Sequence, residues 1–388
     1  MKSNYEPLGK HIQLVDYRNS EEVTSTVLGI SIDKEFMPSV ANVIGTDLSR
    51  YKLISKGLFA CNPMHVGRDE RLPIALYEKD SPAIVSPAYF MFEIIDRDVL
   101  NEEYLMMWFR RPEFDRECWF MTDGSVRGGI TWDDLCRIKL PVPSYARQCE
   151  IVESYRAITD RIALKRAEND NLEATAMSLY KSWFIDYEPF DLDDEGLPVG
   201  WCKEKLNDKL STSTQSINPQ KMDCDFVWHY SIPAYDNEKL PSKDTPSSIL
   251  SNKYIVPQNA ILVSKLNPDT KRIWRSVPCF ENAICSTEFI VFSTKEPTHR
   301  AFYYLLFNTG SFIDFLVSNA TGSTNSRMRV KPASSLDFEF ICPPNEVIDS
   351  FCRKVEPLLQ KIEENHLEIR KLKELIPIAV AKMMSSSR

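Results

Sequence analysis

An internal repeat with a period of about 200 residues constrains the fold of this chain more than any other feature. Residues 86–92 (SPAYFMF) align with residues 286–292 (STEFIVF), and Tyr104-Leu105 aligns with Tyr304-Leu305. This period is far longer than the roughly 20–50 residues of a solenoid repeat. It has the length of a whole domain plus a connecting helix, so the chain is expected to contain two similar globular segments.

Each globular segment is followed by a long helical pattern whose apolar residues recur with the 3.5-residue period of a coiled coil. The first pattern covers about residues 147–184 and the second begins near residue 344. We expect the two helices to pair with each other; the alternative is two separate helices, each lying on its own domain. The residues expected in the seam of the helix pair are Ile151, Tyr155, Ile158, Ile162, Leu172, Leu179, Val355, Leu358, Ile362, Ile369, Leu372 and Ile376.

Polar residues and prolines interrupt this apolar stripe. Lys165, Asn169 and Asn365 fall at seam positions, where a polar side chain fixes the register of a helix pair at some cost in stability. Pro357 and Pro377 predict a kink, a late start or a frayed end in the second helix.

The globular segments combine short β-type runs, such as residues 89–92 and 260–263, with helical stretches. Strands and helices do not alternate regularly, so we predict a mixed α+β fold with an irregular, largely antiparallel sheet in each segment. The expected organisation is a globular segment at 1–145, a helix at 146–186, an acidic linker at 187–200, a globular segment at 201–343 and a helix at 344–388.

Motifs of enzymatic chemistry are missing from the chain. The sequence has no phosphate-binding loop, no glycine-rich dinucleotide turn and no nucleophile elbow. Its five histidines and ten cysteines show no metal-ligand spacing. We therefore expect no catalytic residues, no metal and no cofactor in this chain. The sequence also lacks a signal peptide and an apolar run of about eighteen residues, which predicts a cytoplasmic protein.

Nucleic-acid binding is suggested by four loops that combine basic, polar and glycine residues at equivalent places in the two halves: 62–71, 123–131, 265–275 and 321–331. Arginine and asparagine can read base edges, whereas lysine, serine and threonine can hold phosphates. The alternative is that these are ordinary solvated loops, and the net charge of −8 argues against indiscriminate coating of nucleic acid. The candidate DNA-binding residues are Arg68, Arg71, Ser125, Arg127, Lys265, Asn267, Lys271, Arg272, Arg275, Thr324, Asn325, Arg327, Arg329 and Lys331.

Several stretches, taken together and in order, resemble the specificity subunits of type I restriction-modification enzymes. Residues 138–144 (IKLPVPS), 148–151 (QCEI) and 179–186 (LYKSWFID) are similar to the central conserved region of that family. Residues 196–201 (GLPVGW) resemble its entry into the second recognition domain, and residues 321–325 (TGSTN) resemble the turn before its second conserved helix. The resemblance covers essentially the whole chain.

The resemblance implies two pseudo-repeated target recognition domains, each reading one half of a bipartite, asymmetric site in double-stranded DNA. Two long helices would pair antiparallel and act as a ruler between the half-sites. Two methylation subunits would bring S-adenosylmethionine, and restriction subunits would bring ATP and magnesium. The chain itself would be non-catalytic and would act in the prokaryotic cytosol.

Three other interpretations stay open at this point. The chain can be the specificity subunit of a type II enzyme that cleaves beside a split site, a coiled-coil scaffold that binds protein, or an enzyme in its own right. The second half also departs from the family pattern, because residues 341–345 (ICPPN) are not followed by a counterpart of Gln148. Residues 1–145 are acidic, which predicts weak DNA binding by the chain alone and tight, salt-sensitive binding with its methylation partner.

Overall fold

Two units, each with its own hydrophobic core, make up the chain. The computed structural model describes residues 5–39, 45–64, 66–122, 128–277, 280–322 and 328–385, with side chains described up to residue 378. Unit 1 comprises Met1–Arg161 with Leu372–Arg388, and unit 2 comprises Ile162–Lys371. Each of the two long helices contributes one part to each unit.

Unit 1 is built from short strands joined by turns and short helices. Its strands are β1 (Tyr5–Pro7), β2 (Ile12–Leu14), β3 (Val27–Ile30), β4 (Phe36–Pro38), β5 (Lys52–Ile54), β6 (Phe59–Cys61), β7 (Ile74–Leu76), β8 (Ala83–Val85), β9 (Phe90–Ile94) and β10 (Lys139–Pro141). Its shorter helices are η1 (Leu8–Lys10), η2 (Leu48–Arg50), α1 (Val66–Asp69), α2 (Glu102–Phe109), α3 (Pro112–Phe120) and α4 (Trp132–Arg137). The strands form sheets in the orders β2-β9-β6-β7, β4-β3-β8-β5 and β1-β10.

Unit 2 has a similar inventory. Its strands are β11 (Cys202–Lys205), β12 (Leu210–Ser213), β13 (Ser216–Ile217), β14 (Val227–Tyr230), β15 (Ser242–Asp244), β16 (Lys253–Ile255), β17 (Ile261–Ser264), β18 (Ile273–Arg275), β19 (Ala283–Cys285), β20 (Phe289–Thr294) and β21 (Glu339–Cys342). Its shorter helices are α6 (Leu206–Lys209), η3 (Pro219–Lys221), α7 (Ile232–Glu238), η4 (Pro246–Ser248), η5 (Pro297–His299), α8 (Arg300–Phe307), α9 (Gly310–Ser318) and α10 (Pro332–Ser335). The sheets run β12-β20-β17-β18, β13-β16-β19-β14-β15 and β11-β21.

The strand orders repeat from one unit to the other, which confirms the internal repeat and the α+β class. The ribbon β1-β10 corresponds to β11-β21, and the sheet β2-β9-β6-β7 corresponds to β12-β20-β17-β18. Each unit also has a parallel pair, β3 with β8 and β14 with β19, among otherwise antiparallel pairings of the described strands. The expectation of one irregular sheet per segment is wrong, because the short strands are divided among three sheets in each unit.

Side chains alternate between the two faces of each central strand, and this alternation explains why the central sheet of each unit lies between two other layers. In β17, Ile261 and Val263 lie in the core that faces the helices, whereas Leu262 lies in the core that faces the second sheet. In β6, Phe59 and Ala60 divide in the same way between two cores. Because successive side chains point to opposite faces, each central sheet is covered by helices on one face and by a second sheet on the other.

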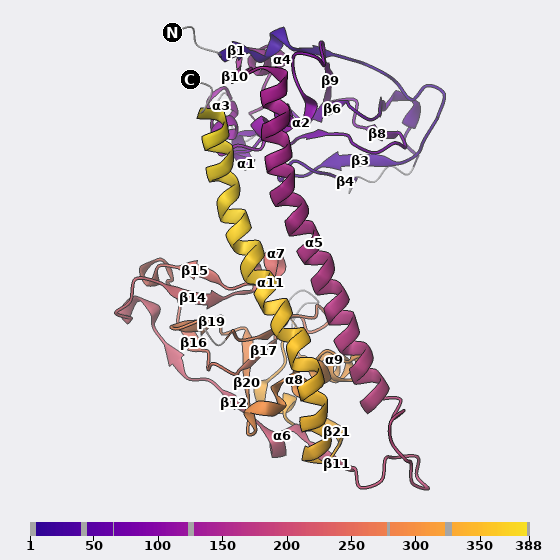
Figure 1. Ribbon diagram of the computed structural model, residues 1–388, viewed down its shortest axis with the longest axis vertical. Helices are drawn as coiled ribbons and strands as arrows, with labels where there is room; N and C mark the ends of the chain where they lie inside the picture. Colours follow the sequence, from indigo (N-terminus) through magenta and orange to yellow (C-terminus); the bar gives the residue numbers. More distant parts are fainter. Residues whose placement is uncertain are drawn as a thin grey trace. The chain divides into compact units, whose positions relative to one another are not determined.

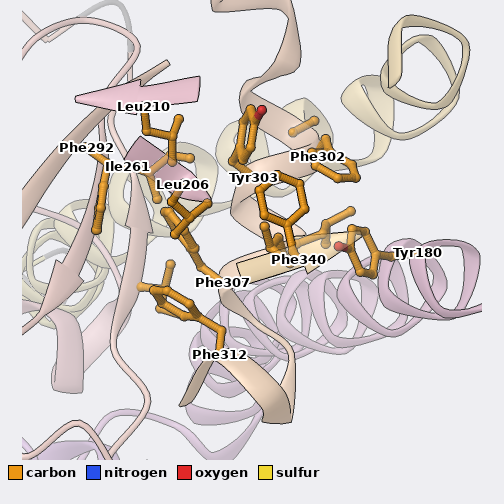
Figure 2. Close-up of a cluster of buried hydrophobic side chains, with 14 of the residues drawn as sticks. Tyr180, Leu206, Leu210, Ile261, Phe292, Phe302, Tyr303, Phe307, Phe312 and Phe340 are labelled. Atoms are coloured by element: carbon orange, nitrogen blue, oxygen red, sulfur yellow. The ribbon is translucent and has the colours of Figure 1, made fainter. Parts of the chain in front are cut away.

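The helix-facing core of unit 2 is rich in aromatic side chains. Tyr180 packs against Phe302 of α8 and Phe351, with ring centroids 5.6 and 5.9 Å apart. Figure 2 shows this cluster, in which Phe307 and Phe312 of the neighbouring short helices stack at 4.5 Å beside strand residues such as Ile261 and Phe292. The helix-facing core therefore holds the long helices to the sheet.

The long helices α5 (Tyr145–Phe184) and α11 (Asn345–Ser385) pair antiparallel within each unit (Figure 1). In unit 2, Lys165 bonds to Asn365 whereas Tyr180 contacts Phe351, so the partner's number falls as the α5 number rises. This pairing confirms the predicted fold class. The helix α11 is continuous through Pro357 and Pro377, both on its exposed side, where water can satisfy the carbonyl groups that the prolines leave free.

The expected seam residues differ in burial. Those that are buried are Ile151, Ile162, Val355, Ile362 and Ile369. Those that are half-buried are Tyr155, Ile158, Leu172, Leu179, Leu358, Leu372 and Ile376. Leu359, next to the expected Leu358, is the more deeply buried of the two, which reflects the slow drift of an α-helix against a 3.5-residue period.

The polar seam residues form a connected layer in unit 2. The Asn365 side chain accepts a hydrogen bond from Lys165 Nζ at 2.9 Å and donates to Asn169 Oδ1 at 2.8 Å. Lys165 also forms ion pairs with Glu168 and Glu368 at 3.0 and 3.4 Å. Sliding one helix past the other would place these buried polar groups against apolar side chains, so the layer fixes the register.

Candidate nucleic-acid interface

In each unit the structure brings the two candidate loops together. In unit 1 the amide of Gly67 donates to the Gly128 carbonyl at 3.0 Å, and the Ile130 amide donates to the Pro63 carbonyl at 3.1 Å. In unit 2 the Val330 amide donates to the Lys265 carbonyl at 3.0 Å. The four loops therefore form two surfaces, which we call loop pair 1 (residues 62–64 and 66–71 with 128–131) and loop pair 2 (residues 265–272 with 328–331).

A glycine allows the close approach in loop pair 1. A β-carbon on Gly129 would lie 2.8 Å from the carbonyl oxygen of Pro63, too close for any other residue without a backbone shift. The same two segments are joined by the Ile130–Pro63 hydrogen bond. Gly129 thus permits the two halves of loop pair 1 to share backbone hydrogen bonds.

An asparagine organises loop pair 2. Asn267 adopts a left-handed conformation with φ of 47°, which asparagine tolerates better than most residues. Its amide donates to the Met328 carbonyl at 2.8 Å, and its side-chain oxygen accepts from the Met328 amide at 3.2 Å. Asn267 was predicted as a DNA contact, and its side-chain oxygen is engaged in joining the two loops.

The described arginine candidates at or near the surface are held by carboxylates; the Arg272 side chain is 15% exposed and that of Arg329 is 45% exposed. Arg272 binds Asp236 through two hydrogen bonds of 2.7 and 2.9 Å, and Arg329 binds Glu288 through two of 3.0 and 3.1 Å. The hydrogen bonds to these carboxylates raise the pKa values of both guanidinium groups, which therefore stay charged. The corresponding pairs in loop pair 1 are Arg68 with Asp69 at 2.7 Å and Arg71 with Asp33 at 3.0 Å.

These carboxylates are the part of the surface that the sequence did not indicate. Asp236 and Glu288 lie 36 and 41 residues from their arginine partners, so no local pattern connects them. A DNA phosphate has to replace such a carboxylate before it can bind the guanidinium in the same bidentate way. The arrangement lowers the net gain from each arginine–phosphate contact.

The lysine candidates differ from the arginines in their surroundings. Lys271 is exposed and donates to the Asn308 carbonyl at 3.4 Å, and partial desolvation lowers the pKa of its ammonium group. Lys331 is exposed at the start of α10, whereas Lys265 is half-buried. Lys271 and Lys331 are therefore exposed cations of loop pair 2, as is Arg329 with its carboxylate partner.

Arg275 does not fit the expected role, because its side chain is buried in unit 2. It is 6% exposed and forms ion pairs with Glu356 and Glu363 of α11. A guanidinium enclosed by two carboxylates beneath a sheet cannot reach DNA, so Arg275 is removed from the candidate contacts. Five other candidates lie outside the described residues: Ser125, Arg127, Thr324, Asn325 and Arg327.

The start of α5 carries a buried polar contact that docks it on unit 1. Gln148 is fully buried; its Nε2 donates to the carbonyls of Val99 and Pro143 at 2.8 and 2.9 Å, and its Oε1 accepts from the Asn101 amide at 2.8 Å. Asn101 in turn caps α2. The corresponding position of α11 is Ile348, which is buried and apolar, so the two units hold their helices by different means.

The fold and the paired loops define a duplicated α+β protein with an antiparallel helix pair. Comparison with known proteins shows which proteins have a similar sequence and fold. No family model matches the chain. In sequence, it is 23% identical to the specificity subunit of the type I restriction enzyme MjaIX from Methanocaldococcus jannaschii, over 317 residues that cover 75% of this chain and 70% of that protein. It is 20% identical to the specificity subunit of the type I restriction enzyme HindI from Haemophilus influenzae, which covers 66% of this chain and 70% of that protein.

A solved structure shows the same fold. The crystal structure of the S subunit of a type I restriction-modification system from M. genitalium superposes with a TM-score of 0.56 and 12% identity, and the match covers 98% of this chain and 95% of that one. The chain is thus similar to type I restriction-modification specificity subunits in sequence and shares their fold, as residues 138–151 and 179–201 had predicted by their resemblance to that family. Among the described residues, no helix combines the length and apolar character needed to cross a membrane.

Proposed function

We propose that this chain is the DNA-specificity subunit of a type I restriction-modification complex. Loop pair 1 and loop pair 2 each read one half of a bipartite site in double-stranded DNA. The chain is non-catalytic by itself and positions methylation subunits, with S-adenosylmethionine, and restriction subunits, with ATP and magnesium. The observation that carries the proposal is the duplication of one loop pair on one strand topology, in a chain similar to specificity subunits.

The domain boundaries and the asymmetry of the site are part of the proposal. Residues 1–145 and 201–343 are the two recognition domains, residues 146–186 and 344–388 are the spacer helices, and residues 187–200 link them. Loop pair 1 presents Arg68 and Arg71, whereas loop pair 2 presents Lys271, Arg272 and Arg329. Because different side chains read different base edges, the two half-sites differ and the site is not a palindrome.

Methylome sequencing tests this function directly. The chain is expressed with its neighbouring methylation subunit, and the DNA of these cells is compared with DNA from cells that lack the chain. One new split motif with methylated adenines is the expected result. If the assembled complex, supplied with S-adenosylmethionine, methylates no motif, the chain is instead a scaffold that binds protein. Enzymatic turnover by the purified chain alone would also contradict the proposal.

Replacing Arg329 by alanine should weaken DNA binding in a salt-dependent manner. A guanidinium that binds phosphate releases about one counterion, so its loss lowers the slope of log K against log salt by about 1. The measurement is fluorescence anisotropy of the chain with its methylation subunit on a labelled duplex, at several salt concentrations. Arg147→Ala is the matched control, since Arg147 lies on α5 outside both loop pairs, is half-buried and is paired with Glu150 at 2.7 Å. Equal slopes for R329A and wild type would remove Arg329 from the interface.

A further inference from the structure

Four charged side chains, two buried arginines and two partly buried glutamates, form a network in unit 2 that the proposed DNA contacts do not use. Arg275, the last residue of β18, donates from Nη2 to Glu356, and its Nε lies 3.3 Å from Glu363 Oε1. Arg300, the first residue of α8, lies 3.9 Å from Glu356 and 3.7 Å from Glu363. Its Nη1 also donates to the Ser276 carbonyl at 2.8 Å. The network joins a strand and a short helix to two glutamates one heptad apart on α11.

The network is costly to bury. Arg275 and Arg300 are 6% and 5% exposed. Burial raises the pKa of Glu363 and lowers that of Arg300 to about 10, whereas the opposite charges nearby favour the ionised forms. Apolar side chains of similar volume stabilise a core at least as well as buried ion pairs do. A charged network instead fixes the relative position of the elements it joins. The planar guanidinium group forms good hydrogen bonds to a carboxylate in only a few orientations.

Unit 1 shows that this strand position does not need a charge to fold. Arg275 pairs with Ile261 in the sheet of unit 2, and Leu76 pairs with Phe59 at the corresponding place in unit 1. Leu76 packs against the apolar core beneath its sheet. Of these two equivalent strand positions, only the one in unit 2 carries a charged network.

The strand β18 connects the network to loop pair 2. Arg272 immediately precedes β18, and its carbonyl accepts from the Ser264 amide at 3.0 Å, which closes the hairpin. Trp274, between Ile273 and Arg275, points to the opposite face and donates to the Lys239 carbonyl at 2.7 Å. Arg272 and Arg275 are three residues apart, which is about 10 Å along a strand. A shift of Arg275 against α11 is thus carried directly to loop pair 2.

We propose that Arg275, with Arg300, Glu356 and Glu363, holds loop pair 2 in a defined position on α11 and so determines base preference in the half-site read by residues 201–343. This inference rests on the proposed function. It makes Arg275 a positioning residue, and the side chains that reach the DNA are those of the loop beyond it.

The test uses the full chain with its methylation subunit, and the readouts are the methylome motif and the rate of methylation. Glu363→Gln removes one charge and keeps the shape of the side chain. The double variant R275L/E363L removes one charge of each sign and places leucine at the strand position, as in unit 1. Glu364→Gln is the matched control, because Glu364 is the neighbouring residue on α11 and its side chain is 70% exposed.

We expect methylation to slow roughly tenfold in both network variants, because displacements of about 1 Å have large effects on recognition geometry. Base preference should relax in one half of the split motif only, while E364Q behaves as wild type. The salt slope of DNA binding should stay unchanged, since no phosphate contact is lost.

A wild-type motif and rate in both network variants would overturn the inference and leave the proposed function intact. Equal relaxation of base preference in both half-sites would also overturn the inference. So would loss of folding in both variants, measured by thermal melting, because the network would then act on stability alone. If wild-type protein methylates no motif, the proposed function itself has failed, and the inference fails with it.

Discussion

Replacing Phe351 by alanine should lower the free energy of unfolding of unit 2 by about 3–5 kcal/mol, the range for aromatic residues truncated in a core. Phe351 is fully buried near the start of α11. Its ring lies 4.7 Å from that of Phe184, 5.6 Å from that of Trp183 and 5.9 Å from that of Tyr180. The cavity left behind is bounded by rigid rings on α5 and cannot collapse easily, so the cost falls in the upper part of this range.

Differential scanning calorimetry and urea unfolding measure the effect. For a unit of this size, the expected loss corresponds to a fall of roughly 10 °C in melting temperature. Phe120→Ala is the control, because Phe120 is 78% exposed at the end of α3 in unit 1 and loses little contact on truncation. If F351A and F120A melt at the same temperature as wild type, the aromatic cluster does not hold α11 to unit 2.

Replacing Gln148 by leucine should destabilise unit 1 by about 3 kcal/mol, although leucine is apolar and of similar size. The side-chain amide of Gln148 is itself fully buried and satisfies two backbone carbonyls and one backbone amide through part-buried hydrogen bonds. Each buried backbone group left without a partner costs about 1–3 kcal/mol. The Asn101 amide, which loses its acceptor, belongs to the residue that caps α2.

Thermal and urea unfolding, read by near-ultraviolet circular dichroism, check this second prediction. The same substitution at an exposed place, Gln13→Leu, is the control; Gln13 donates one surface hydrogen bond to Glu93 at 2.9 Å. We expect Q13L to change stability by less than about 0.5 kcal/mol. A Q148L protein as stable as Q13L would mean that α5 docks on unit 1 through apolar contacts alone.

The long helices are held to the two units by different kinds of contact. In unit 1 the neutral amide of Gln148 bonds to the backbone, and in unit 2 the corresponding residue of α11 is the apolar Ile348. Unit 2 instead has the aromatic contacts of Phe351 and the ion pairs of Arg275 with Glu356 and Glu363. The repeated topology is therefore held to its helices by different chemistry in the two copies.

Features of this protein that depend on local pattern could be predicted from its residues alone. The alignment of residues 86–92 with 286–292 predicted a duplicated fold, because equivalent strands need similar apolar spacing. The 3.5-residue period predicted that α5 and α11 pair with each other, since a continuous apolar stripe must be buried against another one; the antiparallel direction was implied by the family resemblance. The stretches around Gln148 and Trp183 resembled those of specificity subunits, and the comparisons confirmed this similarity.

Contacts between residues far apart in the chain became visible only in the folded structure. The fold joins the two segments of loop pair 1, and likewise those of loop pair 2, through backbone hydrogen bonds, which carry no sequence signature. It also buried Arg275 between two glutamates about 80 residues further along the chain, although its basic neighbours had suggested a DNA contact. An arginine side chain has the same local sequence signal whether it faces solvent or a carboxylate, and burial is decided by packing between distant elements.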